Sequence, residues 1–200
     1  KAMRIQPDLD NVLGNILSTK MNSCNWDNLS SLLSDLKQKI VNNEKVINPF
    51  KLLGLIDDAA LQRVTSETFS NSNHPKSNTL APIKDHPKHP KIRIGYFSAD
   101  FRKHPVAYLT AELYEVHDRS HFEIHAFSFG PNTNDEMNLR IKAGVDHFHD
   151  VHAMTHQEIA ELARSLEIDI AVDLTGFTAE ARTDVFAMCA APIPLSYIGY

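Results

Sequence analysis

The sequence predicts an α/β fold: a Rossmann-like parallel sheet over residues 91–200, preceded by a small α-helical segment. After residue 91, short apolar segments with strand patterning alternate with segments of helical spacing. Residues 1–70, by contrast, show helical spacing alone. Alternating strands and helices are typical of a parallel sheet that carries helices on both faces.

Composition limits the classes of function. Two hundred residues with 42% hydrophobic content can bury the core of one domain with an appended segment. A net charge of −5 without a basic stripe argues against a nucleic-acid partner, and no apolar run reaches the roughly 20 residues that span a bilayer. Cys24 and Cys189 fit no metal or redox spacing, so we expect a reducing, cytoplasmic compartment.

Residues 1–70 are predicted to form helices, over 9–21, 29–40 and, more weakly, 57–69. Asn25 or Asp27 is predicted to cap the second helix, and Pro49 to open an irregular turn. Residues 71–90 hold four prolines among polar residues, which predicts a linker.

From residue 91 onward the elements alternate. Strands are predicted over 92–97, 122–129, 146–151, 168–174 and 194–199, and helices over 105–116, 138–143, 157–166 and 181–189. Pro105 suits a first helical turn because its missing N–H is not needed there. The final strand reaches Gly199 without a polar tail, so we expect the chain to be part of a longer protein.

Polar side chains gather where the predicted strands end, which is where open α/β sheets bind ligands. A histidine, two carboxylates and several hydroxyls at one edge could bind a polar ligand and move a proton. His104 is the strongest candidate, because a loop histidine before a proline has no core to fill; the carboxylates and Thr178 are also common in turns and caps. The residues at this edge are Ser98, Asp100, His104, Ser128, Asp173, Thr175, Thr178 and Gly199.

Four histidines raise the alternative of a metal-dependent enzyme. They are His147, His149, His152 and His156. No carboxylate or cysteine pattern completes a recognised site, so no metal is predicted. The glycines form neither a GxGxxG nor a P-loop pattern, so a dinucleotide site is not indicated.

Five stretches in this order resemble a known family: KIRIGYFSADFRKHPVAYL, FEIHAFSFGP, DHFHDV, DIAVDLTGFTAEAR and AAPIPLSYIGY. Together they are similar to the catalytic region of the O-linked N-acetylglucosamine transferases, the tetratricopeptide-repeat glycosyltransferases that include bacterial and SPINDLY-like members. The resemblance covers residues 91–200. TKMNSCNWDNL and PFKLLGLIDDAALQ also look like the segment that joins the repeats to the core in bacterial members.

The resemblance implies a GT-B architecture, with the active site between two Rossmann-like halves. This chain would carry the N-terminal half; the C-terminal half, with most contacts to the UDP-sugar, would be absent, so the fragment alone is not expected to turn over. The implied reaction is inverting transfer of N-acetylglucosamine from UDP-N-acetylglucosamine to Ser/Thr of a protein or peptide acceptor. The donor is a substrate, and neither a cofactor nor a metal is expected.

The resemblance also implies roles for individual residues. His104 matches the histidine of the family's HP motif, a proposed general base, and Asp173 and Thr178 fall in its second cleft-edge motif; we expect these three to be catalytic. Phe177 and Glu180 depart from the residues usual in relatives, which puts acceptor contacts in question. Substrate contacts are expected at Ser98, Asp100, Pro105 and Arg182.

Two alternatives to this function stay open. The chain could belong to a family member that uses another sugar, such as glucose or fucose, or an asparagine acceptor. It could also be a non-catalytic interaction scaffold on a degenerate Rossmann-like domain.

Overall fold

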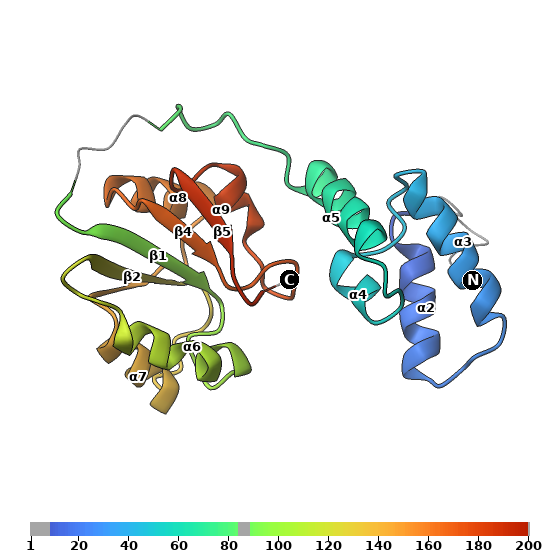
Figure 1. The fold of residues 1–200 in the computed structure, drawn as a ribbon, viewed down its shortest axis with the longest axis horizontal. Helices are drawn as coiled ribbons and strands as arrows, with labels where there is room; N and C mark the ends of the chain where they lie inside the picture. The colour runs from blue at the N-terminus through green and yellow to red at the C-terminus, as the bar shows by residue number, and fades with distance from the viewer. Residues whose placement is uncertain (1–8, 84–88, 200) are drawn as a thin grey trace. The chain divides into compact units, whose positions relative to one another are not determined.

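The computed structural model describes residues 9–83 and 89–199. The chain divides into two compact units, Lys1–Pro75 and Lys76–Tyr200, which we describe separately (Figure 1).

The first unit is helical. Its apolar stripes meet in one core built around the fully buried Leu17, Leu36 and Leu52. Its helices are α2 (Val12–Asn22), α3 (Leu29–Val41), α4 (Pro49–Leu53) and α5 (Ala59–Asn73).

Three details of this unit correct the sequence prediction. The cap of α3 is Asn28, in the left-handed conformation with φ 55°, and not Asn25 or Asp27; the Asn25 side chain instead accepts a hydrogen bond from the backbone of Asp27. A short helix, α4, replaces the irregular turn because the Asn48 side chain accepts from the Phe50 N–H and caps it. Helix α5 runs to Asn73, into the segment predicted as linker.

The second unit contains a five-stranded, entirely parallel sheet in the order β3-β2-β1-β4-β5. The prediction of a Rossmann-like parallel sheet preceded by a helical segment is confirmed. Its strands are β1 (Ile92–Ser98), β2 (Phe122–Ser128), β3 (His147–Asp150), β4 (Ile170–Asp173) and β5 (Ile193–Ser196). Its helices are α6 (Pro105–Val116), α7 (Glu136–Gly144), α8 (His156–Ser165) and α9 (Thr183–Ala187).

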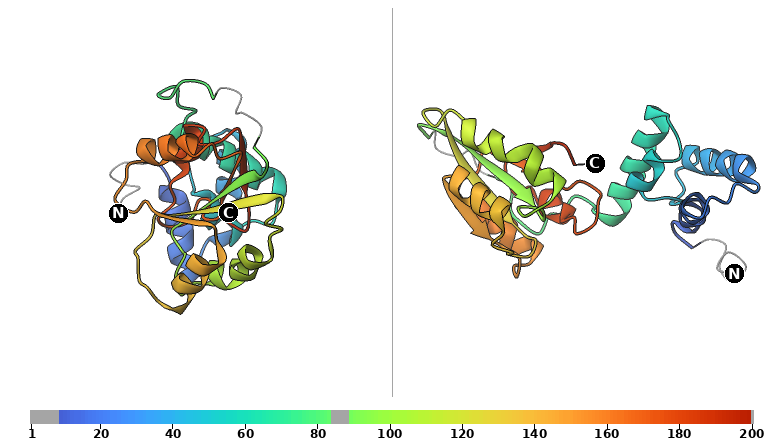
Figure 2. Two further views of the ribbon diagram at one scale, coloured as in Figure 1. Left: turned by 90° about the vertical axis from the view of Figure 1, so that its left-hand side faces the viewer. Right: turned by 90° about the horizontal axis from the view of Figure 1, so that it is seen from below.

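Helices cover both faces of this sheet (Figures 1 and 2). Alternation along β1 sends Phe97 toward α8 and α9, and Tyr96 toward α6 and α7. Phe97 stacks on Phe127 of the neighbouring strand, with ring centroids 4.3 Å apart. The two layers of apolar side chains hold the central strands β2-β1-β4 rigidly, and the loops at the ends of these strands are therefore built on a fixed frame. Within the described residues, no helix combines the length and apolar character needed to cross a membrane.

Candidate functional site

The carboxyl ends of β1, β2 and β4 bring the predicted residues to one edge of the sheet. In the strand register Ser98 pairs with Ser128, and Phe97 pairs with Asp173. Ser98 and Ser128 are both buried at this edge. The loops that follow the strands carry the accessible chemistry.

The loop between β1 and α6 holds three of the predicted residues. The Ser98 hydroxyl accepts a hydrogen bond from the Asp100 N–H at 2.9 Å, which tightens the turn after β1. Asp100 is buried, and its Oδ2 lies 3.5 Å from Nδ1 of His104. Pro105 is the first residue of α6, as predicted. The sequence therefore places a carboxylate beside a partly exposed imidazole.

His104 also caps helix α6. The Val106 N–H donates to its Nδ1 at 3.3 Å, an interaction that requires Nδ1 to be unprotonated. The neutral ring then carries its proton on Nε2. If Nδ1 is protonated instead, it faces the Asp100 carboxylate and Nε2 is free to accept a proton. The geometry thus offers two tautomers, and only the one facing Asp100 leaves Nε2 as a base.

Asp173 is the last residue of β4, and Thr178 lies in the loop that follows it. Oδ1 of Asp173 accepts the N–H of Thr175 at 2.9 Å and that of Gly176 at 3.2 Å, and the Thr178 hydroxyl donates to the Thr175 carbonyl at 2.8 Å. Burial raises the pKa of the Asp173 carboxyl, while the two backbone hydrogen bonds act to lower it. Gly176 is left-handed with φ 59°, as this turn demands. Both side chains therefore stabilise the turn after β4.

An ion-pair chain joins the two loops. Arg102 Nη2 lies 3.2 Å from Oδ1 of Asp100 and 3.3 Å from Oε2 of Glu180. Glu180, which departs from the family pattern, therefore has a defined partner 78 positions away in sequence.

Helix α7 supports the β1–α6 loop from the other side. Asp135 caps α7, and its Oδ2 also accepts the Lys103 N–H at 2.9 Å; Asn138 donates to the Phe101 carbonyl at 2.6 Å. Gly130 packs so closely that an added Cβ would lie 1.8 Å from the Ala99 carbonyl oxygen. The loop that carries His104 is thus fixed at several points.

A cavity of about 560 Å³ opens at the same edge, between the loops that follow β2, β3 and β4. Arg182 lines it, yet its guanidinium is largely engaged: Nη1 donates to the Met154 carbonyl at 2.6 Å and Nη2 to the His152 carbonyl at 2.8 Å. The guanidinium also lies over the Phe129 ring, 5.5 Å from its centroid. Burial lowers the pKa of Arg182. Arg182 therefore shapes this cavity by clasping the loop after β3.

Comparison with known proteins decides the family. Residues 63–200 match the family described as glycosyl transferase family 41, a match over more than half of the chain. The chain belongs to glycosyl transferase family 41. The resemblance noted in the sequence is confirmed.

Two Arabidopsis thaliana proteins are among those similar to this chain. The probable UDP-N-acetylglucosamine–peptide N-acetylglucosaminyltransferase SEC is 37% identical over 119 residues, covering 60% of this chain and 12% of that protein. The probable enzyme of the same activity named SPINDLY is 32% identical over 133 residues, covering 64% of this chain and 14% of that protein. The chain thus spans a small part of these relatives.

A solved structure has a similar fold. A lysine-to-methionine mutant of the O-GlcNAc transferase of Thermobaculum terrenum matches with a TM-score of 0.70 and 25% identity. The match covers all of this chain and 39% of that one.

Two histidines of this family 41 chain line the cavity, although the sequence analysis considered them only as metal ligands. His152 Nδ1 donates to the Phe129 carbonyl at 2.8 Å, which leaves Nε2 as the acceptor of a neutral ring. His156 Nδ1 lies 3.1 Å from Oδ2 of Asp184. Both follow β3, so their place after a strand was the signal that could have identified them as edge residues.

The other two histidines of that group lie elsewhere. His147 and His149 stand on β3, and His147 joins Glu123 and His125 of β2 in a group whose ligand atoms all lie within 4.8 Å of one another. This group could hold a metal ion. The sequence did not predict it, because Glu123 and His125 come from the strand that neighbours β3.

Proposed function

We propose that the chain is the N-terminal half of the catalytic region of a protein O-glycosyltransferase. In this proposal the enzyme transfers N-acetylglucosamine from UDP-N-acetylglucosamine to serine or threonine of a protein or peptide acceptor, with inversion. The family match over residues 63–200 carries the proposal, and the activities for which the relatives are named support its donor and acceptor. Preceding tetratricopeptide repeats and a cytoplasmic location belong to the same proposal; the free thiols of Cys24 and Cys189 are consistent with a reducing compartment.

His104 is the residue we propose for proton transfer. Inverting transfer needs an acceptor hydroxyl in line with the anomeric carbon and a path for its proton. With Nδ1 protonated and directed at Asp100, Nε2 of His104 can receive that proton. Asp100 would then act as a positioning residue that holds the tautomer. We expect the groups that stabilise the leaving diphosphate to lie in the part of the protein beyond this chain.

Asp173, Thr178 and Arg182 have narrower proposed roles. Each makes hydrogen bonds to backbone groups of its own or a neighbouring loop. We propose that Asp173 and Thr178 contribute to catalysis by holding the β4 loop, and that Arg182 contributes to substrate binding by shaping the cavity.

The test uses the full-length protein that contains this chain, with labelled UDP-N-acetylglucosamine and a mixed protein acceptor. His104→Asn is the sharpest variant, because an asparagine side chain can still cap α6 while it cannot accept the proton. We expect transfer to fall by about a hundredfold to ten-thousandfold, the usual worth of a general base, with an unchanged circular dichroism spectrum. His121→Asn is the matched control, since His121 is an exposed histidine in the turn before β2.

The outcomes are distinct. Unchanged transfer by His104→Asn would leave His104 as a helix cap only and move the search for a base to His152 in the cavity. Transfer from another UDP- or GDP-sugar, or to asparagine, would keep the enzyme and change its substrate. Absence of transfer with every sugar nucleotide would favour the interaction scaffold.

A further inference from the structure

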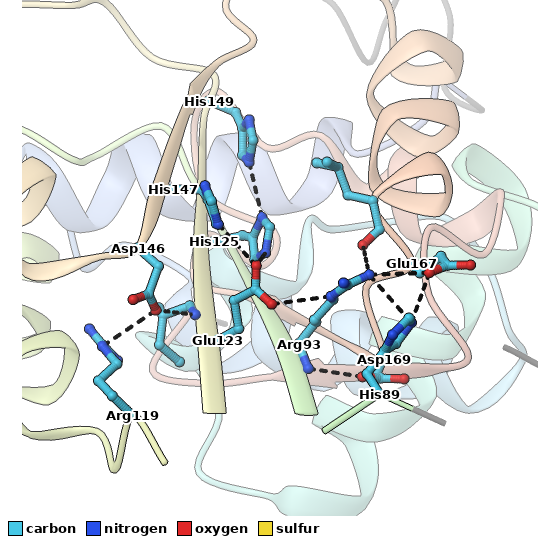
Figure 3. A network of polar contacts seen from close by, with 12 residues as sticks. His89, Arg93, Arg119, Glu123, His125, Asp146, His147, His149, Glu167 and Asp169 are labelled. Atoms are coloured by element: carbon cyan, nitrogen blue, oxygen red, sulfur yellow. Dashed lines mark hydrogen bonds and ion pairs between the residues drawn. The ribbon is translucent and has the colours of Figure 1, made fainter. Parts of the chain in front are cut away.

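Three ligand-bearing side chains converge on the face of the sheet that carries α8 and α9, at the amino-terminal half of β2 and β3 (Figure 3). Glu123 and His125 alternate on β2, and His147 is the register partner of His125 on β3. Glu123 Oε1 lies 2.9 Å from Nε2 of His147 and 3.3 Å from Nε2 of His125. One carboxylate oxygen therefore faces two imidazole nitrogens.

His125 is the central observation. It is 3% exposed, and its Nε2 has no hydrogen-bond partner of good geometry among the described residues, although Oε1 of Glu123 lies 3.3 Å away. A buried polar atom without a partner costs free energy, so its presence calls for an explanation. A metal ion bonded to Nε2 would supply one.

The surroundings would orient such ligands. His125 Nδ1 lies 3.1 Å from Nε2 of His149, so a proton on Nδ1 can be donated there, which leaves Nε2 as the metal-binding nitrogen. The other Glu123 oxygen, Oε2, accepts from Arg93 Nε at 3.2 Å, so Arg93 does not compete with the two imidazoles for Oε1. Because Arg93 is also paired with Glu167, at 3.2 Å, its positive charge is shared between two carboxylates. Figure 3 shows Arg93 and His149 on opposite sides of the three ligands.

We propose that Glu123, His125 and His147 form a binding site for a divalent transition-metal ion such as Zn²⁺. Two imidazoles and one carboxylate are a common zinc ligand set, with water in the fourth position. Ligand atoms about 2.0–2.1 Å from a tetrahedral ion lie about 3.3 Å from one another, close to the two distances to Glu123 Oε1. The half-exposed His147 ring can rotate to bring its Nε2 to the metal. Without metal, His147 Nε2 donates its proton to Glu123, and a bound metal ion would take the place of that proton.

The site is separate from the proposed transfer chemistry. Glu123 is the second residue and His125 the middle residue of β2, whereas the candidate residues lie at or beyond the carboxyl ends of the strands. A metal here would join β3, a four-residue edge strand, to the buried β2. Its role would be to stabilise the sheet, because it bridges two neighbouring strands and reaches none of the loops at the carboxyl edge.

The test is Zn²⁺ binding by the full chain after a chelator has removed any metal. Binding is followed by titration calorimetry, and the metal content of the chain is measured after gel filtration. We expect one Zn²⁺ per chain and a rise in the melting temperature. His147→Ala and Glu123→Gln should each weaken binding by about tenfold or more, since even outer-shell changes cost about 10–100-fold. Both variants keep the buried His125 and are expected to fold. The matched control, His121→Ala, removes a comparably exposed histidine that also faces a carboxylate, that of Asp118.

Co²⁺ offers an independent readout, because four-coordinate Co²⁺ absorbs strongly in the visible range. The proposal expects this band in the wild-type chain and in His121→Ala, and its loss in His147→Ala. Two results would overturn the site: failure of the wild-type chain to retain stoichiometric metal, or equal binding by His147→Ala and the wild type, which would indicate adventitious binding to other surface histidines.

Discussion

Replacing Asp173 tests what the half-buried carboxylate at the end of β4 contributes to the fold. Its Oδ1 accepts two backbone N–H groups, those of Thr175 and Gly176, both of which are buried. Asp173→Ala removes the acceptor, and each unpaired N–H costs about 1–3 kcal/mol when water cannot reach it fully. We expect the free energy of unfolding of the second unit to fall by about 2–4 kcal/mol. Asp173→Asn keeps an acceptor oxygen in place, and its cost should stay within about 1 kcal/mol.

Comparing the wild type with Asp173→Asn at several pH values shows whether the charge on Asp173 stabilises or destabilises the fold. Because burial raises the pKa of Asp173 above its usual value of 3.8, the folded state binds more protons than the unfolded state between the two pKa values. The carboxyl therefore contributes stability below 3.8 that is lost as pH rises through the folded pKa. The stability of Asp173→Asn relative to wild type should accordingly increase from acid to neutral pH.

The assay is denaturant unfolding followed by the tyrosine band in near-ultraviolet circular dichroism. All five tyrosines lie in the second unit, and Tyr96 and Tyr114 pack edge to face with ring centroids 5.0 Å apart, so the band follows that unit. The reasoning fails if Asp173→Ala costs less than about 0.5 kcal/mol, or if Asp173→Asn costs as much as Asp173→Ala. In the full-length protein, loss of transfer by a normally folded Asp173→Asn would support the catalytic role predicted from the sequence.

Three further predictions concern contacts that hold the second unit together. Asp135→Ala should destabilise the second unit by about 1 kcal/mol through loss of the α7 cap. Although burial acts to raise its pKa, hydrogen bonds from Thr133, Lys103 and neighbouring backbone N–H groups lower the pKa of Asp135 to about 2. The stability that Asp135 contributes is therefore present above pH 3.8 and is lost as pH falls toward 2, in wild type and not in Asp135→Ala, as urea unfolding at several pH values would show. Gly130→Ala should cost about 1–3 kcal/mol, because its Cβ would overlap the Ala99 carbonyl, and a melting curve equal to wild type would contradict this close contact. Arg164→Lys should increase hydrogen exchange in residues 76–83, because lysine cannot reach the three backbone carbonyls that the guanidinium joins; unchanged exchange would contradict that role.

The strands were predictable because their sequences carry the burial pattern directly. In β1 and β2, five consecutive residues are buried at the carboxyl end, as mainly apolar segments predict for central parallel strands. The start of α3 at Leu29 was predicted, but its cap, Asn28, was missed because a left-handed cap without a side-chain hydrogen bond leaves no capping pattern in the sequence. Similarly, α4 is too short to show helical spacing.

The candidate site was predictable in location and not in its contacts. Knowing that strands end at Ser98 and Asp173 is enough to place both at one edge. The ion pairs of Arg102 with Asp100 and with Glu180 could not be inferred, since Glu180 lies on a loop 78 residues away and sequence spacing carries no information on such a pair. The same holds for Glu123, which meets His147 only through strand pairing.

Histidines at the carboxyl edge of the sheet have different partners from histidines within the strands, and the difference follows from backbone geometry. At the carboxyl edge the chain leaves the sheet, so backbone N–H and carbonyl groups need partners, and His104 and His152 supply them through Nδ1. Within β2 and β3 the backbone groups are already paired by the ladder, so His125 and His147 have only side chains to face. A histidine at the edge is therefore fixed by the backbone and can present Nε2 to a ligand, whereas one within the strands requires a partner that the neighbouring strand or a bound ion must supply.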